Sequence, residues 1–325
     1  MAVQNANSTH NTPSLSVVML AYNLYANVQR AILNLRMQTV ANQLEIVLVI
    51  PSLSDFGLQE NDLGCFQSWQ TQEIGRITSI GQGYAVGVAS AHAPIVAFTE
   101  EHSFPDSGWA ERLISDHKSG WAAVGPRVLN GNPHSVVGRA DFYLSYGEWS
   151  SPVVSGPVRI LPGHNSCYKR DMLLELGEEL GTLLEAEGIL QRRLKASGYK
   201  LFLDTEISTS HLNYTYWPSW ICKRYYQGWD FASSWSKSWP RPRKMAYILG
   251  SPLIPFIRLW RLRKKICYGQ PYLKIMAVLP VLLTGLTAEA MGHLAGYWSG
   301  VRSCSEKVLK YEINRVEHMK IEGNG

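Results

Sequence analysis

Two carboxylates and an imidazole follow one another directly after a short apolar run. Residues Pro94 to Thr99 (PIVAFT) are expected to form a buried strand, and open α/β sheets bind ligands at the carboxyl ends of their strands. On an extended backbone Glu100 and His102 share one face, and Glu101 lies on the other. Oxygen ligands suit Mg²⁺ or Mn²⁺, and an added imidazole favours Mn²⁺. The pattern predicts a divalent metal site against a diphosphate; a solvated acidic turn that caps a helix at Asp106 is the alternative.

A second pair of carboxylates, Glu185 and Glu187, stands at the expected start of a helix in LLEAEGILQRRLKASGYKL. The helix dipole favours carboxylates at this end, so a structural role is the ordinary interpretation. The functional interpretation is a general base that takes the proton from an acceptor hydroxyl. The pattern by itself leaves both interpretations open.

Three further polar side chains could contact a ligand. His164 and Asn165 lie in a turn opened by a glycine, in PGHNSCYKR, and could bind ligand hydroxyls. His211 stands at the end of an expected strand. For both histidines an ordinary loop or surface residue explains the sequence equally well.

Short apolar runs alternate with helical patterns over the first part of the chain and would position these side chains. Buried strands are expected at Leu15 to Ala21, Leu44 to Ile50, Arg76 to Ile80, Pro94 to Thr99 and Trp121 to Val124. Later, a helix is expected from Leu183 to Ala196, ended by Gly198, and a strand from Tyr199 to Leu203. This alternation predicts an α/β fold with a doubly wound, mostly parallel sheet.

Length and composition limit the protein class. The chain has 325 residues, and 46% are apolar, which predicts a packed core rather than disorder. The polar residues 1–13 lack the basic and apolar regions of a secretory signal, so they are expected to be a flexible N-terminus. The five cysteines are scattered without metal-type spacing, which predicts free thiols in a reducing cytosol.

Positive charge is concentrated in one segment. Between Asp230 and Glu289 there is no acidic residue, and this stretch holds ten of the chain's 31 Lys and Arg residues. The remaining 21 basic residues are outnumbered by the 26 acidic ones. Apolar residues such as Phe256 and Trp260 are interleaved with the cations, which favours an anionic membrane surface over nucleic acid. The segment predicts a membrane partner and no nucleic-acid partner; a solvated face is the alternative.

An apolar stretch from Ile275 to Gly300 follows this basic segment. Its longest charge-free run, Ile275 to Ala288, is shorter than the roughly 20 residues that a membrane span needs. Pro280 interrupts the run, and Glu289 and His293 follow it. A peripheral or re-entrant membrane attachment is therefore predicted rather than a span.

Taken in order, these segments resemble the family 2 glycosyltransferases with a GT-A fold. SVVMLAYN is similar to the opening strand of that family, and Gln38-Thr39 resembles the pair that closes its first helix. GQGYAVGVASAHAPIVAFTEEHSFP resembles its run into the metal-binding strand end, and EAEGILQRRLKASGYKL resembles the helix that carries its base. His211 matches a late histidine near the diphosphate and metal, and RYYQGWDFASSW resembles the segment that follows it.

The resemblance implies inverting transfer of a sugar from a nucleotide-sugar donor to a lipid-linked or cell-surface glycan acceptor. It implies Glu187 as the general base, with Glu185 as the neighbouring candidate, and a Mn²⁺ or Mg²⁺ cofactor held by Glu100, His102 and His211. The implied acceptor-binding residues are His164 and Asn165. The implied donor-binding residues are Ala21, Tyr22, Asn23, Asp55, Gly83, Glu100 and Glu101.

The sequence departs from the family pattern after the second strand. The family has acidic residues there that contact the nucleoside, whereas this chain has Ile50 and Pro51, with Asp55 as the nearest carboxylate. This departure favours the alternative of a non-catalytic GT-A-like protein that binds a sugar nucleotide or glycan. The expected organisation is a transferase domain over 14–235, membrane-associated helices over 236–305 on the cytoplasmic side, and an amphipathic tail over 306–325.

Overall fold

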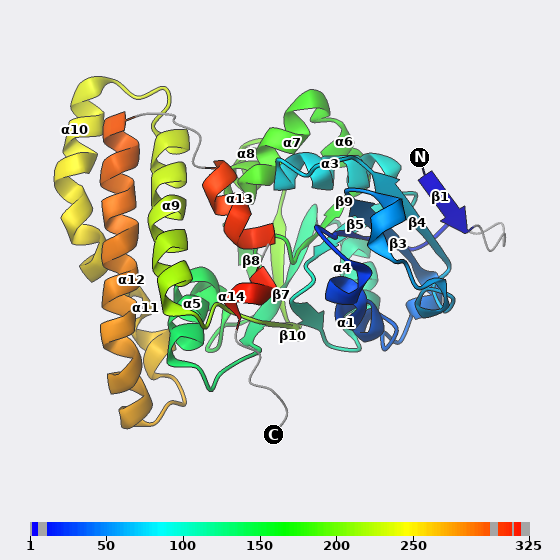
Figure 1. The fold of residues 1–325 in the computed structure, drawn as a ribbon, viewed down its shortest axis with the longest axis horizontal. Helices are drawn as coiled ribbons and strands as arrows, with labels where there is room; N and C mark the ends of the chain where they lie inside the picture. Colours follow the sequence, from blue (N-terminus) through cyan, green and yellow to red (C-terminus); the bar gives the residue numbers. More distant parts are fainter. Residues whose placement is uncertain (1, 6–11, 300–304, 314, 320–325) are drawn as a thin grey trace. The chain divides into compact units, whose positions relative to one another are not determined.

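A mixed β-sheet forms the centre of the part of the chain that carries the predicted site. The computed structural model describes residues 2–5, 12–299, 305–313 and 315–319 (Figure 1). Within them one sheet has the strand order β1-β4-β3-β2-β5-β9-β7-β10-β6, and β8 also pairs with β10. The strands are β1 (Ala2–Asn5), β2 (Leu15–Leu20), β3 (Leu44–Ile50), β4 (Ser68–Glu73), β5 (Ile95–Thr99), β6 (Ser103–Pro105), β7 (Ala123–Asn130), β8 (Gly156–Val158), β9 (Cys167–Lys169) and β10 (Leu201–His211).

The centre of the sheet is parallel and its flanks are antiparallel. Strands β4, β3, β2 and β5 run parallel to one another, whereas β1, β9, β6 and β8 pair antiparallel with their neighbours. Strands β2 and β3 are buried along their whole length, because their mostly apolar side chains pack on both faces of a central strand. Their two buried polar residues, Ser16 and Glu45, are hydrogen-bonded to each other. The predicted α/β class and the parallel centre are confirmed, and the antiparallel flanks are an addition to the prediction.

Helices cover both faces of this sheet. On one face the residues Val17 and Met19 of β2 join a hydrophobic core with Val28 of α1 and Leu113 of α4. On the other face α3 packs on β2 and β3. The helices of this part are α1 (Tyr25–Leu35), α2 (Leu53–Phe56), α3 (Ile80–Ser90), α4 (Trp109–Lys118), α6 (Arg170–Leu174), α7 (Leu180–Glu185) and α8 (Glu187–Ala196).

Three expected elements differ in the structure. The third strand is β4 at Ser68–Glu73, not Arg76 to Ile80, and residues 2–5 of the expected flexible terminus form β1. The expected helix from Leu183 to Ala196 is two helices, because the backbone of Ala186 leaves the helical region with φ of −134° and ψ of 73°. The expected end of this helix is confirmed, since Gly198 has a left-handed backbone with φ of 89°.

The chain divides into two compact units, residues 1–129 with 153–211 and residues 130–152 with 212–325. This division differs from the expected boundary at residue 235, because α5 and α9 pack against α12. The helices of the second unit are α5 (Val136–Tyr146), α9 (Trp217–Trp235), α10 (Arg241–Gly250), α11 (Ile254–Cys267), α12 (Tyr272–Ser299), α13 (Ser305–Ile313) and α14 (Arg315–His318). Residues 6–11, 300–304 and 320–325 of the expected terminus, helical segment and tail lie outside the described residues.

Helix α12 is long and apolar enough to cross a membrane, and no other described helix is. It runs without interruption through Pro280, so the break expected at this proline is absent. Glu289, the carboxylate that follows the charge-free run, forms ion pairs with Arg258 and Arg224 inside the second unit. Within the protein, 44% of the most apolar window of α12 is buried.

Helices α9 and α12 approach each other at backbone distance. A Cβ atom added at Gly292 would overlap the backbone oxygen of Tyr225, and one at Gly228 would overlap that of Glu289. Glycine is therefore needed at both positions for the two helices to lie this close. Ala232 of α9 and Leu286 of α12 are fully buried.

We predict that Gly292→Ala lowers the free energy of unfolding by about 1–3 kcal/mol, the usual cost of an overpacked core. The matched control is Gly250→Ala, since a Cβ atom at this helical position meets nothing within 4 Å. Urea denaturation followed by circular dichroism checks both variants. Equal midpoints for the two variants would contradict the backbone contact.

Candidate active site

Strand pairing brings three candidate metal ligands together. Glu100 follows β5, His102 precedes β6, and His211 is the last residue of β10. Strands β6 and β10 pair in a register that places Ser103 opposite His211, so the two histidines lie side by side with ring centroids 4.7 Å apart. The Nε2 atoms of both histidines lie 3.5 Å from Oε2 of Glu100. One ligand atom from each of the three residues lies within 4.8 Å of the others.

The donor set and spacing fit a divalent ion. Neighbouring ligands of an ion with bonds of about 2.1 Å lie roughly 3 to 3.5 Å apart, which matches the separations around Glu100. His102 and His211 are buried, and the Glu100 side chain is 16% exposed, so the carboxylate faces the accessible side. Two imidazoles with one carboxylate suit Mn²⁺ better than Mg²⁺, which prefers oxygen ligands.

The predicted acceptor residues lie beside the same carboxylate. The Asn165 side-chain amide donates to Oε2 of Glu100 at 3.2 Å and accepts a hydrogen bond from the Ser103 hydroxyl. Nδ1 of His164 lies 3.9 Å from Oε1 of Glu100. The structure therefore places His164 and Asn165 as neighbours that orient Glu100. His164 also has a φ of 53°, an uncommon backbone conformation that is enriched at functional sites.

Glu187 is a buried carboxyl group on the other side of His164. It accepts a hydrogen bond from the backbone N–H of His164, and an added Cβ atom at Gly163 would approach its Oε2 to 2.6 Å. Burial raises the pKa of Glu187 to about 7, which His164 opposes and the negative charge of Glu100 assists. A carboxyl group with this pKa exchanges a proton readily at neutral pH, as a general base must.

Glu185 has a different position from Glu187. Its carboxylate accepts hydrogen bonds from the Ser79 hydroxyl at 2.5 Å and from the backbone N–H of Gly81 at 2.8 Å, at the start of α3. The helix break at Ala186 separates the two carboxylates. Glu185 is therefore the last residue of α7 rather than the start of a helix, and its structural role is to cap the start of α3.

Most of the predicted donor residues lie at one edge of the sheet. Ala21, Tyr22 and Asn23 follow β2, and β2 is parallel to β5, so they leave the sheet at the same edge as Glu100. The exposed Asp55 follows β3, which is parallel to β2.

Two predicted donor residues are buried instead. Gly83 packs on the sheet, where an added Cβ atom would approach Cδ2 of Leu20 to 2.8 Å, so the structure assigns it to packing. Glu101 is 6% exposed, in contrast to the more accessible Glu100.

Tyr84 is a site residue that the sequence analysis missed. Its ring lies 4.8 Å from that of His164, and its hydroxyl donates to the backbone oxygen of Thr99 at 3.3 Å. It therefore fixes His164 and the end of β5 together. The available signal was one aromatic residue within the small-residue run GQGYAVG, at the helix that precedes β5.

No family model and no curated protein matches this chain. The fold class and the metal-ligand cluster therefore rest on the structure itself, and a specific activity is a matter for a proposal.

Proposed function

We propose that this protein is an inverting, family 2-like glycosyltransferase that uses a nucleotide-sugar donor and a lipid-linked or cell-surface glycan acceptor. The proposal depends on one observation. His164 lies between Glu100, which is grouped with His102 and His211, and the buried Glu187, whose pKa is about 7. Such a pair suits inverting group transfer from a diphosphate, because negative charge develops on the leaving group while the acceptor hydroxyl loses a proton.

Each residue of the site has a role in this reaction. Deprotonated Glu187 takes the proton of the acceptor hydroxyl, whose oxygen attacks the anomeric carbon as the bond to the nucleoside diphosphate breaks. Glu100, His102 and His211 would hold Mn²⁺ or Mg²⁺, which supplies positive charge to the diphosphate when bound. Asn165 and Ser103 orient Glu100 through their hydrogen bonds. Tyr84 holds the ring of His164.

A non-catalytic protein that binds a sugar nucleotide or glycan is the second candidate. Strand β3 ends in Ile50 and is followed by Pro51, so the acidic contact to the nucleoside that the resemblance implies is absent at these two positions. Release of free nucleoside diphosphate from a sugar nucleotide distinguishes the transferase from the binding protein.

We propose that the second unit attaches the protein peripherally to the cytoplasmic face of a membrane. Helices α10 to α12 expose large apolar side chains, which soluble surfaces seldom gather in number. The most exposed are Leu249, Phe256, Trp260, Tyr272, Leu273 and Trp298. Exposed cations such as Arg263 and Lys264 accompany them on α11, and apolar and cationic side chains together suit an anionic lipid surface.

Removal of metal ligands tests the cofactor. We predict that the double variant Glu100→Ala/His102→Ala weakens Mn²⁺ binding by more than the roughly 10- to 100-fold that loss of a supporting contact costs. Isothermal titration calorimetry with Mn²⁺ measures this without substrate. The matched control is Glu60→Ala/His134→Ala, which changes the same residue types at exposed positions. Unaltered Mn²⁺ affinity in the site variant would remove these residues as ligands.

Glu187→Gln tests the base. We predict a rate reduced by about 10²–10⁴-fold and loss of the activity increase that the wild type shows as pH rises through about 7. Because folding raises this pKa from 4.5, the wild type loses stability as pH rises from 4.5 to 7.

The neutral glutamine avoids this loss, so thermal unfolding at pH 8 should show a variant at least as stable as the wild type. Glu185→Gln should instead change stability without removing the pH dependence of the rate. Wild-type turnover in Glu187→Gln would exclude Glu187 as the base.

Membrane attachment should combine charge and apolar contact. We predict that high salt releases only part of the protein from membranes, because salt screens charge but leaves apolar burial intact. Phe256→Asp/Trp260→Asp should abolish the salt-resistant part in a sedimentation assay. Met37→Asp is the control, since this exposed apolar residue lies in the first unit. Complete release of the wild type by salt would contradict the apolar contribution, because charge alone would then explain the attachment.

A further inference from the structure

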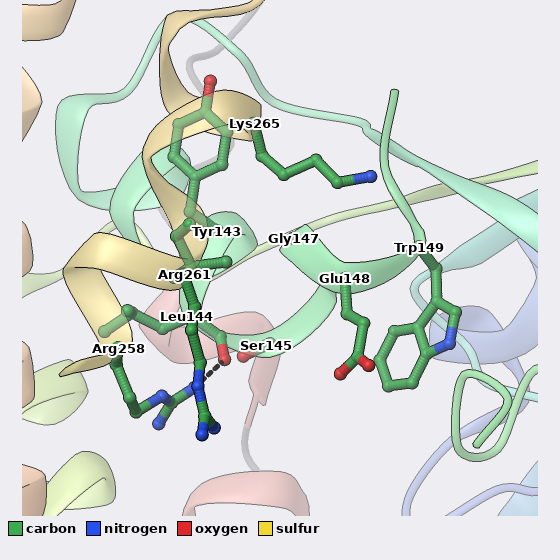
Figure 2. A pocket seen from close by; sticks show the side chains of 10 residues that line it. Tyr143, Leu144, Ser145, Gly147, Glu148, Trp149, Arg258, Arg261 and Lys265 are labelled. Carbon is green, nitrogen blue, oxygen red and sulfur yellow. Dashed lines mark hydrogen bonds between the residues drawn. The ribbon is translucent and has the colours of Figure 1, made fainter. Parts of the chain in front are cut away.

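A cavity in the second unit gathers positive charge. It has a volume of about 490 Å³ and lies between α5, α11 and the short helix η3 (Gly147–Trp149) (Figure 2). Its lining includes three cations, Arg258, Arg261 and Lys265, with Glu148 as the one acidic residue. In the view of Figure 2 the two guanidinium groups lie together and Lys265 lies apart from them. The cavity therefore carries a net positive charge and is large enough for a small polar group.

Two of these cations already form hydrogen bonds or ion pairs with other residues of the chain. Arg258 donates to the backbone oxygen of Leu144 at 2.8 Å and pairs with Glu289. Lys265 donates to the backbone oxygens of Ser150 and Pro152, each at 2.5 Å. These contacts fix the cavity wall.

Arg261 differs from these two cations. It is exposed, and within the described residues no hydrogen bond or ion pair is found for it. Its guanidinium is therefore available to a ligand, and a guanidinium binds phosphate oxygens through two parallel N–H bonds.

The cavity lies next to the apolar surface of the same helix. Arg261 is one helical turn after Ile257, an apolar side chain that is 46% exposed on the same face of α11. No acidic residue lies on α10 or α11. A ligand with an anionic head and an apolar chain would satisfy both parts of this helix at once.

We propose that this cavity binds the phosphate group of an anionic lipid. Arg261 donates to the phosphate, Lys265 and Arg258 supply further positive charge, and the lipid chain lies along the apolar side chains of α11. The inference rests on the proposed membrane attachment but not on the proposed sugar transfer. The same phosphate chemistry is offered by soluble phosphates, so the test must separate the two sources.

The experiment compares two single variants of α11 on lipid vesicles. Arg261→Gln removes the cavity cation, and Lys264→Gln removes an exposed cation of the same helix that does not line the cavity. Each protein is sedimented with phosphatidylcholine vesicles that contain a fixed fraction of phosphatidic acid or of phosphatidylglycerol. Phosphatidic acid exposes a terminal phosphate, whereas phosphatidylglycerol supplies charge with a covered phosphate.

We expect the wild type to prefer phosphatidic acid. Arg261→Gln should lose this preference with an affinity reduced roughly tenfold or more, because a hydrogen-bonded charge is lost. Lys264→Gln should keep the preference and lose only about fivefold on both vesicles, the effect of one surface cation. Arg261→Lys should keep the general attraction to charge but only part of the preference.

Three results would overturn the site. Equal losses in Arg261→Gln and Lys264→Gln would show a general charge effect, and the membrane attachment would stand without the cavity. Binding of inorganic phosphate that depends on Arg261, without a preference for phosphatidic acid, would assign the cavity to a soluble phosphate. A wild type that binds neither vesicle would overturn the membrane attachment itself, and the lipid site with it.

Discussion

The antiparallel pairing of β6 with β10 is the interaction on which the candidate site depends. It joins segments about a hundred residues apart in the chain and fixes Ser103 opposite His211. His102 reaches its partner through this backbone register, since both histidines lie within one residue of the pairing. Backbone hydrogen bonds of a sheet hold such positions more firmly than a loop would, which suits a site whose ligand atoms must stay within a narrow range of distances.

The sequence predicted those elements whose signal is local. The limits of β3 were found because LEIVLVI is apolar and largely β-branched apart from Glu45. Strand β4 was missed because its buried Gln70 is polar, and its hydrogen bonds to Glu45 and to the Ser90 backbone help to make that burial acceptable. Such partners lie at least twenty residues away, so no local pattern contains them.

In the candidate site, too, some features could be predicted from local sequence and others could not. Glu100, His102 and His211 were found from their residue types and their positions at strand ends, yet residues 100–102 form a turn rather than the extended backbone assumed. The separate roles of Glu185 and Glu187 could not be predicted, because Ala186 and the two residues beside it are good helix formers. The break there is associated with contacts to Ser79 on one side and to His164 on the other.

The break at Ala186 has a consequence for how the site moves. One residue separates a carboxylate that holds the start of α3 from a carboxylate that is bound to the backbone of His164. A link of this length has almost no slack, so a displacement of α3 is transmitted through the backbone to Glu187. Tyr84 of α3 also contacts the ring of His164, so α3, His164 and Glu187 are joined by two separate sets of contacts. In the proposed reaction, a change at the start of α3 would therefore be felt at Glu187.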